Sequence, residues 1–267
     1  MEKYKIPTLT IAGSDSSGGA GIQADLKTFS AIGTYGMSVI TAITAQNTHG
    51  VFLVEDLSKE IIQKQIEVVF DDIPPKAVKI GMVSSPEIIK VIVDTLNKYE
   101  TNYLVVDPVM ISKSGYSLLK PEAKENLIKY LIPKAYIVTP NTLEAEEITG
   151  MKIENVEDMK IVGEKILNLG PKYVLMKGGH LDGDAVDVLI GKDIFEVYKS
   201  ERLNRKNTHG TGCTLSSAIT AYLALGYNIV DAVSNAKKYI TDAIRYSFDI
   251  GSGVGPVHHF YKFDENK

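Results

Sequence analysis

A turn containing two glycines leads into a run of small and apolar residues late in the chain. The turn is Asn207-Thr208-His209-Gly210-Thr211-Gly212-Cys213-Thr214, and the run continues through Leu223. A glycine turn in front of a helix directs several backbone N–H groups at one point, and the helix dipole adds partial positive charge there. The stretch therefore predicts an anion-binding site, and we call residues 207–214 the anion turn.

The only cysteine of the chain, Cys213, lies where this turn becomes the predicted helix. Positive potential at a helix start lowers the pKa of a thiol, so the sequence predicts a partly ionised Cys213 near neutral pH and makes it a candidate base. The alternative is a tight turn in which a small buried residue only fills space. One cysteine also excludes an internal disulfide.

Polar side chains follow several predicted strands at the point where each strand ends. Asp107, Asn141 with Glu144, and Lys177 each come directly after or close to such an end. Together with an anion site they suit phosphoryl transfer, in which positioning and charge neutralisation supply most of the rate. Lys177 can bind phosphate, and the oxygen atoms of Asn141, Glu144 and Asp107 can hold Mg²⁺ directly or through water.

Other motifs point elsewhere or are absent. The segment 19–24 fits the dinucleotide fingerprint G-x-G-x-x-A, but it begins about half a dozen residues after its strand, whereas a true fingerprint follows almost at once. Asp25, about one turn into the next helix, is either a solvated acid or a polar group that reaches a substrate. The chain has no G-x-x-x-x-G-K-[ST] phosphate loop and no H-E-x-x-H or paired cysteines typical of zinc sites.

Strand and helix patterns alternate along the chain, which predicts an α/β fold with a mainly parallel sheet covered on both faces. The predicted strands are 9–12, 39–45, 77–80, 103–106, 136–139 and 173–176, with a loop at 46–50 and an antiparallel edge hairpin of 185–190 and 194–198. The predicted helices are 22–32, 58–71, 86–99, 121–131, 214–225 and 229–246, and the tail 251–267 is predicted to be irregular, with glycines at the rim of a nucleotide site. In such sheets ligands bind at the carboxyl ends of the strands.

Composition narrows the class of protein. The 267 residues, 44% of them hydrophobic, can build one large core, and we expect a single domain over 1–267. A formal net charge of -4 without blocks of like charge argues against nucleic acid or a membrane as the main partner. The start of the chain lacks the apolar run of a signal peptide and no stretch approaches a membrane span, so we expect a cytoplasmic protein with a small ligand.

Seven segments resemble those of the hydroxymethylpyrimidine/phosphomethylpyrimidine kinases of thiamine biosynthesis. The resemblance is collinear over nearly the whole chain. The segments are AGSDSSGGAGIQAD (12–25), TAQNT (44–48), VKIGM (78–82), DPVM (107–110), TPN (139–141), KGGH (177–180) and THGTGC (208–213).

The resemblance implies a ribokinase-like fold, a three-layer α/β/α sandwich with a central, mostly parallel sheet, and commonly a homodimer. It implies two successive reactions that use ATP with Mg²⁺, with a monovalent cation left open. The first phosphorylates the hydroxymethyl group of 4-amino-5-hydroxymethyl-2-methylpyrimidine, and the second converts the monophosphate to the diphosphate.

The resemblance also implies roles for matching residues. Cys213 stands where most ribokinase-like enzymes place a catalytic aspartate, Gln46 matches a pyrimidine-reading glutamine, and Lys177 matches the phosphate lysine. The residues that match the family's anion-binding turn are Gly210, Thr211 and Gly212. Those that match its nucleotide site are Asn141, Glu144, Lys177, Thr208 and His209. Asp107 and Glu144 match the family's metal site. The residues that match the walls of its substrate pocket are Gly13, Asp25, Met82 and Val109.

Two rival functions remain open on the sequence alone. Some pyridoxine kinases share the cysteine turn, and the segments 247–250 and 254–256 look somewhat like theirs, so pyridoxine/pyridoxal kinase is an alternative as main or side activity. The other rival is a catalytically silent sensor of the pyrimidine. A sensor has no need of the set formed by Asn141, Glu144, Lys177 and Cys213.

Overall fold

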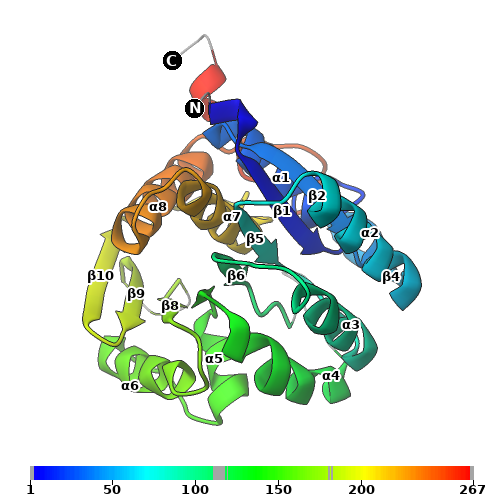
Figure 1. The fold of residues 1–267 in the computed structure, drawn as a ribbon. Coiled ribbons are helices and arrows are strands. Elements are labelled where there is room, and N and C mark those ends of the chain that lie inside the picture. Colours follow the sequence, from blue (N-terminus) through cyan, green and yellow to red (C-terminus); the bar gives the residue numbers. More distant parts are fainter. Residues whose placement is uncertain (1–2, 111–117, 119, 180, 182, 265–267) are drawn as a thin grey trace.

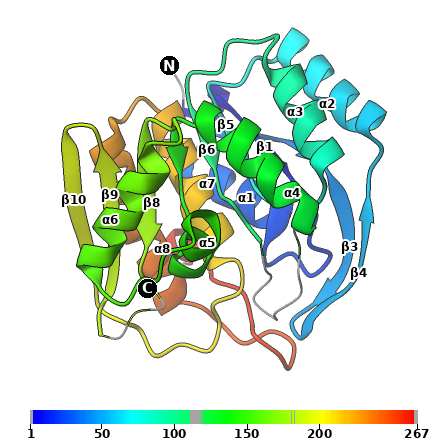
Figure 2. The same cartoon turned by 90° about the horizontal axis from the view of Figure 1, so that it is seen from below.

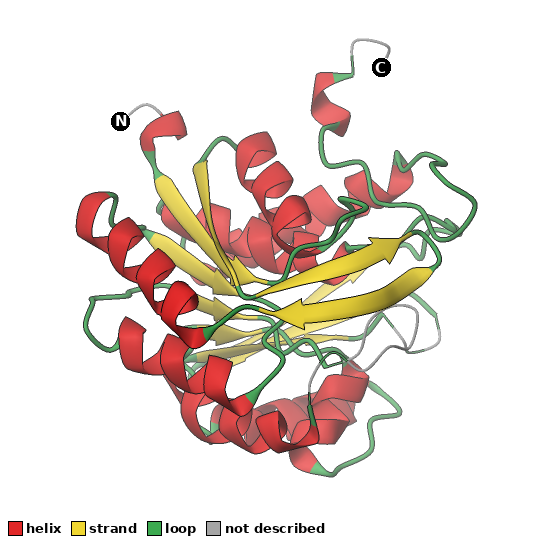
Figure 3. Ribbon diagram, turned by 90° about the vertical axis from the view of Figure 1, so that its right-hand side faces the viewer, coloured by secondary structure: helices red, strands yellow, loops and turns green. Residues whose placement is uncertain are grey.

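The computed structural model describes residues 3–110, 118, 120–179, 181 and 183–264 of the chain. An eight-stranded sheet forms the middle layer and helices cover both of its faces, as Figures 1 and 3 show. The helices α1, α7 and α8 pack together on one face, and α2 to α6 cover the other. A separate two-stranded ribbon, β3 and β4, lies beside the main sheet (Figure 2). The predicted three-layer α/β/α class is confirmed.

The strand order of the main sheet is β10-β9-β8-β7-β6-β5-β1-β2, and only β9 runs antiparallel to its neighbours. The strands of this sheet are β1 (Pro7–Ala12), β2 (Tyr35–Ile40), β5 (Ala77–Ile80), β6 (Leu104–Val106), β7 (Ile137–Val138), β8 (Tyr173–Lys177), β9 (Ala185–Gly191) and β10 (Ile194–Ser200). The ribbon consists of β3 (Ala42–Asn47) and β4 (Gly50–Asp56). The hairpin predicted at a sheet edge is β9 with β10.

The described helices follow the predicted periodicity, with ends shifted by a few residues. They are α1 (Gly21–Ile32), α2 (Lys59–Asp72), α3 (Pro86–Leu96), α4 (Pro121–Asn126), α5 (Thr142–Thr149), α6 (Val156–Leu167), α7 (Thr211–Ala224) and α8 (Ile229–Arg245). Short turns complete the set: η1 (Lys3–Lys5), the π-helical η2 (Leu127–Leu131), η3 (Ile132–Lys134) and η4 (Tyr261–Phe263).

Local chemistry explains where several helices begin. Ser58 and Ser85 accept hydrogen bonds from the first turns of α2 and α3, which satisfies backbone donors that have no partner inside the helix. Asn141 and Glu144 form a reciprocal capping box at the start of α5. The side chains that the sequence suggested for chemistry therefore also fix the start of this helix.

The prediction of one buried strand over 39–45 is wrong. The chain leaves the main sheet after Ile40, and at Thr41 the backbone N–H donates to Ala12 O (3.0 Å) while the carbonyl accepts from Leu57 (2.9 Å). From Ala42 the residues alternate between buried and exposed, as in a ribbon with one covered face. The composition of this apolar run does not show that it passes from one sheet to another. As a result, the predicted loop 46–50 begins within β3.

The core fills both sides of the sheet with aliphatic side chains. Leu9, Ile11 and Ile80 pack against α2 and α3 on one side, and Val105 and Ile137 pack against α7 and α8 on the other. Strands buried on both faces read as continuous apolar runs, which is the pattern that the sequence shows. Up to residue 264, the tail after α8 is irregular apart from η4, as expected.

Candidate active site at the carboxyl edge of the sheet

Five neighbouring parallel strands deliver the predicted site residues to one edge of the sheet. In the order β8-β7-β6-β5-β1 their carboxyl ends lead to Lys177, Asn141, Asp107, Met82 and Gly13. These strands are parallel and adjacent, so residues remote in sequence become neighbours. The edge is where ligands of such sheets bind.

Lys177 lies at the centre of a polar cluster. Its Nζ is 2.9 Å from Asp107 Oδ1 and 3.9 Å from Glu144 Oε2. Asp107, which is buried, also accepts hydrogen bonds from the hydroxyls of Thr139 (3.1 Å) and Ser216 (3.2 Å). Glu144 is held by the capping box, in which its Oε2 accepts from the backbone N–H of Asn141 at 2.8 Å.

The charges in this cluster shift one another's protonation. Burial acts to raise the pKa of Asp107, but Lys177 and Lys79 outweigh it and hold that pKa below its usual range. Burial acts to lower the pKa of Lys177, and Asp107 and Glu144 raise it nonetheless. For Glu144, burial together with the charge of Asp107 raises the pKa to about 7. At neutral pH the site thus holds the protonated Lys177 ammonium beside the ionised Asp107 and beside Glu144, whose pKa is near neutrality.

The glycine turn brings the start of α7 to this cluster. Gly210 has φ 78°, and a Cβ at this position would lie 1.8 Å from Gly19 O, so only glycine fits between the two loops. A Cβ at Gly212 would lie 3.6 Å from Lys177 Nζ and 3.8 Å from Asp107 Oδ2. The Thr211 hydroxyl donates to Thr208 O at 2.7 Å and closes the turn. The N-terminus of α7 therefore faces the ammonium group of Lys177.

Cys213 lies in the first turn of α7, as the third residue of that helix. Burial raises the pKa of its thiol to about 11, although the nearby Lys79 ammonium and a hydrogen bond from the Gly21 backbone act to lower it. The prediction of a partly ionised thiol near neutral pH is therefore wrong for the free protein. Desolvation outweighs the helix start, a balance that the local sequence does not contain.

Asp25 is completely buried, so the expectation of a solvated acid is wrong, and in the free protein its carboxylate is not open to a substrate either. Its carboxylate is 2.7 Å and 2.8 Å from Lys79 Nζ and accepts hydrogen bonds from Thr10 (2.6 Å) and Ser217 (2.6 Å). All of these partners are buried as well. Asp25 joins α1 to β1, β5 and α7 behind the anion turn.

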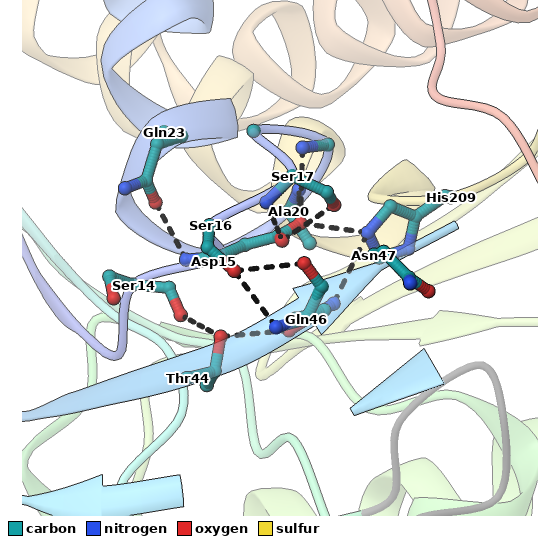
Figure 4. A network of polar contacts seen from close by, with 12 residues as sticks. Ser14, Asp15, Ser16, Ser17, Ala20, Gln23, Thr44, Gln46, Asn47 and His209 are labelled. Atoms are coloured by element: carbon teal, nitrogen blue, oxygen red, sulfur yellow. Dashed lines mark hydrogen bonds and ion pairs between the residues drawn. The ribbon is translucent and has the colours of Figure 1, made fainter. Parts of the chain in front are cut away.

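The expected pocket walls lie close to this layer. A Cβ at Gly13 would lie 3.1 Å from Met82 Sδ and 3.6 Å from Ala42 O, so the end of β1, the end of β5 and the start of β3 meet here. Val109 follows Asp107 by two residues, and its N–H donates to Asp107 O at 2.8 Å. Gln46, near the end of β3, is half-buried and faces the loop after β1 (Figure 4).

The His209 ring, which we expected at the nucleotide, instead faces this same loop. Its Nε2 is 2.8 Å from Asp15 Oδ2 and 3.3 Å from Gln46 Nε2, as Figure 4 shows. Asp15 also accepts from the backbone N–H groups of Gly19 and Ala20. An internal carboxylate thus lies in front of the start of α1, where a dinucleotide fingerprint would place the pyrophosphate, and this argues against the fingerprint interpretation.

The donor atoms at this edge of the sheet suit a metal ion that keeps much of its hydration. Among the residues that the structure describes, no group of three or more histidine, cysteine, aspartate or glutamate side chains could hold a metal ion. Both oxygens of Asp107 already accept hydrogen bonds, and Lys177 lies between Asp107 and Glu144. The donor set therefore fits an ion that is held mostly by water and ligand oxygens rather than by a complete protein cage.

The chain's tail closes one side of the site region. A cavity of about 410 Å³ opens beside His209, between the β3–β4 turn and the tail. Val254 N–H donates to Thr48 O at 2.8 Å, and Gly255 N–H donates to Asn207 Oδ1 at 3.0 Å, so the tail is tied to that turn and to the anion turn. The other tail glycines lie near Thr48, and their place at a nucleotide rim stays a prediction.

Three residues of the site region are not predicted from the sequence. Lys79 is a charged residue inside a strand that is otherwise buried, which is a signal that a partner must exist. Ser216, one turn after Gly212, contacts Asp107, and Asp15 fixes the loop after β1. For Ser216 and Asp15 the sequence has no signal beyond their place in a conspicuous motif. His180, which ends the KGGH segment, lies outside the described residues.

Fold and site together define a ribokinase-like kinase: a mainly parallel sheet whose carboxyl edge carries a lysine, two acids and an anion turn. The family model described as phosphomethylpyrimidine kinase matches residues 15–258, and the chain belongs to this family. No helix among the described residues has both the length and the apolar character to cross a membrane.

Individual relatives include two kinases of this name and one pyridoxal kinase. The chain is 52% identical over 259 residues to a hydroxymethylpyrimidine/phosphomethylpyrimidine kinase of Rhizobium meliloti (strain 1021), covering 96% of this chain and 97% of the relative. It resembles the crystal structure of phosphomethylpyrimidine kinase (thiD) from Clostridium difficile 630 with 78% identity and a TM-score of 0.82, covering 90% and 99% of the two chains. The ADP complex of Bacillus subtilis pyridoxal kinase has 40% identity and a TM-score of 0.90, covering 97% and 99%.

Proposed function

We propose that this kinase acts in thiamine biosynthesis and phosphorylates 4-amino-5-hydroxymethyl-2-methylpyrimidine and then its monophosphate, with ATP as phosphoryl donor. The observation that carries the proposal is the meeting of the α7 N-terminus with Lys177: a Cβ at Gly212 would lie 3.6 Å from Lys177 Nζ. In the transition state of phosphoryl transfer, negative charge is spread over the oxygens of the migrating group, and these donors neutralise it. The catalytic set is proposed to act within one domain spanning 1–267.

Lys177 is proposed to bind the phosphates. Its side chain is 14% exposed, so it is screened from bulk water yet open at the edge of the sheet. Asp107, Glu144 and the turn around Asn141 hold it in place. Once a phosphate arrives, the ammonium gains a further anionic partner without having to be desolvated first, which is the advantage of a preorganised site.

Cys213 is retained as the candidate base, and the structure limits how it can act. With a thiol pKa of about 11, about one molecule in 10⁴ is ionised at pH 7. A loose phosphoryl-transfer transition state leaves the attacking alcohol nearly neutral, so it demands little from a base. The second reaction needs even less, because its nucleophile is a phosphate oxygen that is already ionised.

Mg²⁺ is proposed to bind together with the nucleotide. Glu144 and Asp107 are the acids that would hold it, through water in the case of Asp107, whose oxygens are engaged by Lys177, Thr139 and Ser216. The ion would neutralise charge on the phosphate oxygens. Thr208 and Asn141 are proposed to lie beside the nucleotide, at the start of the anion turn and of α5.

Pyridoxal kinase activity is proposed as a side activity. The similarity to Bacillus subtilis pyridoxal kinase, at 40% identity over nearly the whole of both chains, favours it. Substrate selection must then depend on the few side chains that face the ring. Gln46 is the proposed reader, because a carboxamide complements the amino group and ring nitrogen of an aminopyrimidine.

The deciding experiment is mass spectrometry of the products formed with Mg²⁺ and ATP from the pyrimidine alcohol, from its monophosphate and from pyridoxal. We expect the monophosphate and diphosphate from the first, the diphosphate from the second, and slower formation of pyridoxal phosphate. Pyridoxal phosphate as the main product would make the side activity the principal one. Binding of the pyrimidine without any ADP release would instead indicate a sensor.

A homodimer is also proposed. The ribbon of β3 and β4 exposes Ile43 (53%) and Leu53 (64%), which its register places on the same face, and Phe52 (66%) lies next to them. A neighbouring apolar set of this kind is typical of a surface covered by another subunit. Sedimentation of the wild type and of Leu53→Glu tests it, and a monomeric wild type would contradict it.

A further inference from the structure

The loop after β1, the anion turn and β3 are joined by one hydrogen-bond network, drawn in Figure 4. Asp15 is at its centre: Oδ2 accepts from Ala20 N–H (2.7 Å), Gly19 N–H (3.0 Å) and His209 Nε2 (2.8 Å), and Oδ1 accepts from the N–H and hydroxyl of Ser17. Burial acts to raise the pKa of Asp15, but His209 and Ser17 lower it to about 2. The carboxylate is therefore ionised and accepts only.

This carboxylate determines which nitrogen of His209 carries hydrogen. At 2.8 Å from an ionised oxygen, Nε2 must be a donor, because two lone pairs at this distance repel each other. The same holds for a neutral ring and for a charged one. His209 Nε2 therefore cannot accept a hydrogen bond from Gln46.

Two neighbours of the Gln46 amide then decide which way the amide faces. One end lies 3.3 Å from His209 Nε2 and the other lies 3.2 Å from Thr44 Oγ1, whose single hydrogen is donated to Ser14 O at 2.8 Å. With the amide nitrogen toward His209, two donors face each other, and with the carbonyl oxygen toward Thr44, two acceptors do. A half-turn of the amide removes both mismatches: an N–H then faces the Thr44 oxygen, and the carbonyl oxygen faces His209 Nε2–H, whose single hydrogen it shares with Asp15 in a bifurcated bond.

We propose that Asp15, His209 and Thr44 are positioning residues that hold the Gln46 amide with its carbonyl oxygen toward His209 and its NH₂ group toward Thr44, and that they thereby set substrate selectivity. The proposal rests on the proposed function. One lone pair and one N–H of Gln46 stay free for a ligand. An aminopyrimidine then binds with its amino group on the His209 side and its ring nitrogen on the Thr44 side.

Removing a positioning residue releases the amide, so the preference for an amino-bearing ring falls while phosphoryl transfer continues. In His209→Leu the loop after β1 should keep its conformation, because Asp15 still accepts four hydrogen bonds from Ser17, Gly19 and Ala20. Thr44→Val keeps the shape of the side chain and removes its oxygen. Thr95→Val is the matched control: its hydroxyl, also buried, donates to a backbone carbonyl within α3, away from the site.

The test compares kcat/KM for the aminopyrimidine alcohol and for the same alcohol without its amino group. We expect the wild type and Thr95→Val to prefer the amino compound by about tenfold or more, and His209→Leu and Thr44→Val to reduce this preference to about threefold or less. In these two variants kcat for the compound without the amino group should change little. An undiminished preference in both would overturn the proposal.

A second measurement separates this proposal from the proposed function. ¹⁵N NMR of histidine-labelled protein, with the His209 signals assigned by their loss in His209→Leu, should show hydrogen on Nε2 in the free protein. An Nε2 without hydrogen would overturn the amide assignment even if the kinase reaction is confirmed. Failure of the wild type to phosphorylate the pyrimidine, with Nε2 protonated, would contradict the proposed function and the selectivity role while leaving the network intact.

Discussion

Lys79 and Asp25 form an ion pair of 2.7 Å in which neither side chain is exposed. Lys79 comes from the middle of β5 and Asp25 from the first turns of α1, and the hydroxyls of Thr10 and Ser217 complete the shell around the carboxylate. Burial acts to lower the pKa of Lys79, but the charge of Asp25 raises it above its usual value. The pair supports α7 from behind, at the level of Cys213.

Breaking this pair should destabilise the fold strongly. Lys79→Met leaves the Asp25 carboxylate buried without its cation, and loss of one partner of a buried pair costs about 3–5 kcal/mol. Urea unfolding followed by circular dichroism measures it. Lys79→Met combined with Asp25→Asn should regain part of the loss, and Lys90→Met, which breaks an exposed pair with Asp94, should have no measurable effect. A small loss in Lys79→Met would mean that water reaches the pair.

Lys177 and Glu144 should contribute to the rate rather than to pyrimidine affinity. Lys177→Ala and Glu144→Gln are each expected to lower kcat by about 10²-fold or more, because the first removes the cation proposed to neutralise the phosphates and the second removes a carboxylate proposed to hold Mg²⁺. Gln at position 144 can still form the capping box of α5, so stability should be retained. Steady-state kinetics of both variants measure the loss of kcat, and titration with the pyrimidine measures any change in its affinity. Loss of pyrimidine affinity equal to the loss of rate in Lys177→Ala would contradict the assignment.

The buried Glu144 should make stability depend on pH in a defined direction. Its pKa is raised from 4.5 to about 7, so between these values the folded state holds a proton that the unfolded state has released. The contribution of this group to stability is fully present below pH 4.5 and is lost as the pH rises through 7. Urea unfolding from pH 4.5 to 8 should show this decline in the wild type, and its absence from Glu144→Gln would confirm the source.

Cys213 should reveal any role as a base through pH dependence. With a thiol pKa of about 11, a rate that needs the thiolate rises about tenfold per pH unit from 7 to 10. A role as base therefore requires this rise for the first phosphorylation in the wild type and its loss in Cys213→Ala, with part of the activity restored in Cys213→Asp. The second phosphorylation should respond less. Equal activity of the wild type and Cys213→Ala at every pH would show that Cys213 only packs.

Gln46 should control the choice between the two vitamin precursors. Pyridoxal lacks the amino group and ring nitrogen side by side, and a buried amide left partly unpaired costs about 1–3 kcal/mol. We expect a preference for the pyrimidine of about tenfold to a few hundredfold in kcat/KM, lost in Gln46→Met because the amide is gone. Competition between the two substrates in both proteins measures it. An unchanged ratio would show that Gln46 does not read the ring.

Much of the fold and half of the site follow from local sequence signals. The alternation of apolar strands with amphipathic helices predicts the parallel sheet. Lys177 and Asp107 stand directly at strand ends, and Asn141 follows the end of β7 by three residues. Since parallel neighbours share one edge, knowing that these residues end strands is nearly enough to bring them together. The glycine turn before α7 is equally local, because φ of 78° at Gly210 requires glycine whatever surrounds it.

The tertiary structure alone decided the features that depend on remote partners. His209 meets Asp15 across 194 residues and Gln46 across 163, and no spacing rule connects such positions. The ionisation of Cys213 depends on burial by the surrounding loops, which overrides the helix start that the sequence displays. Sequence periodicity reports how each segment shields its own apolar face, whereas desolvation and long-range pairing arise only when separate segments pack together.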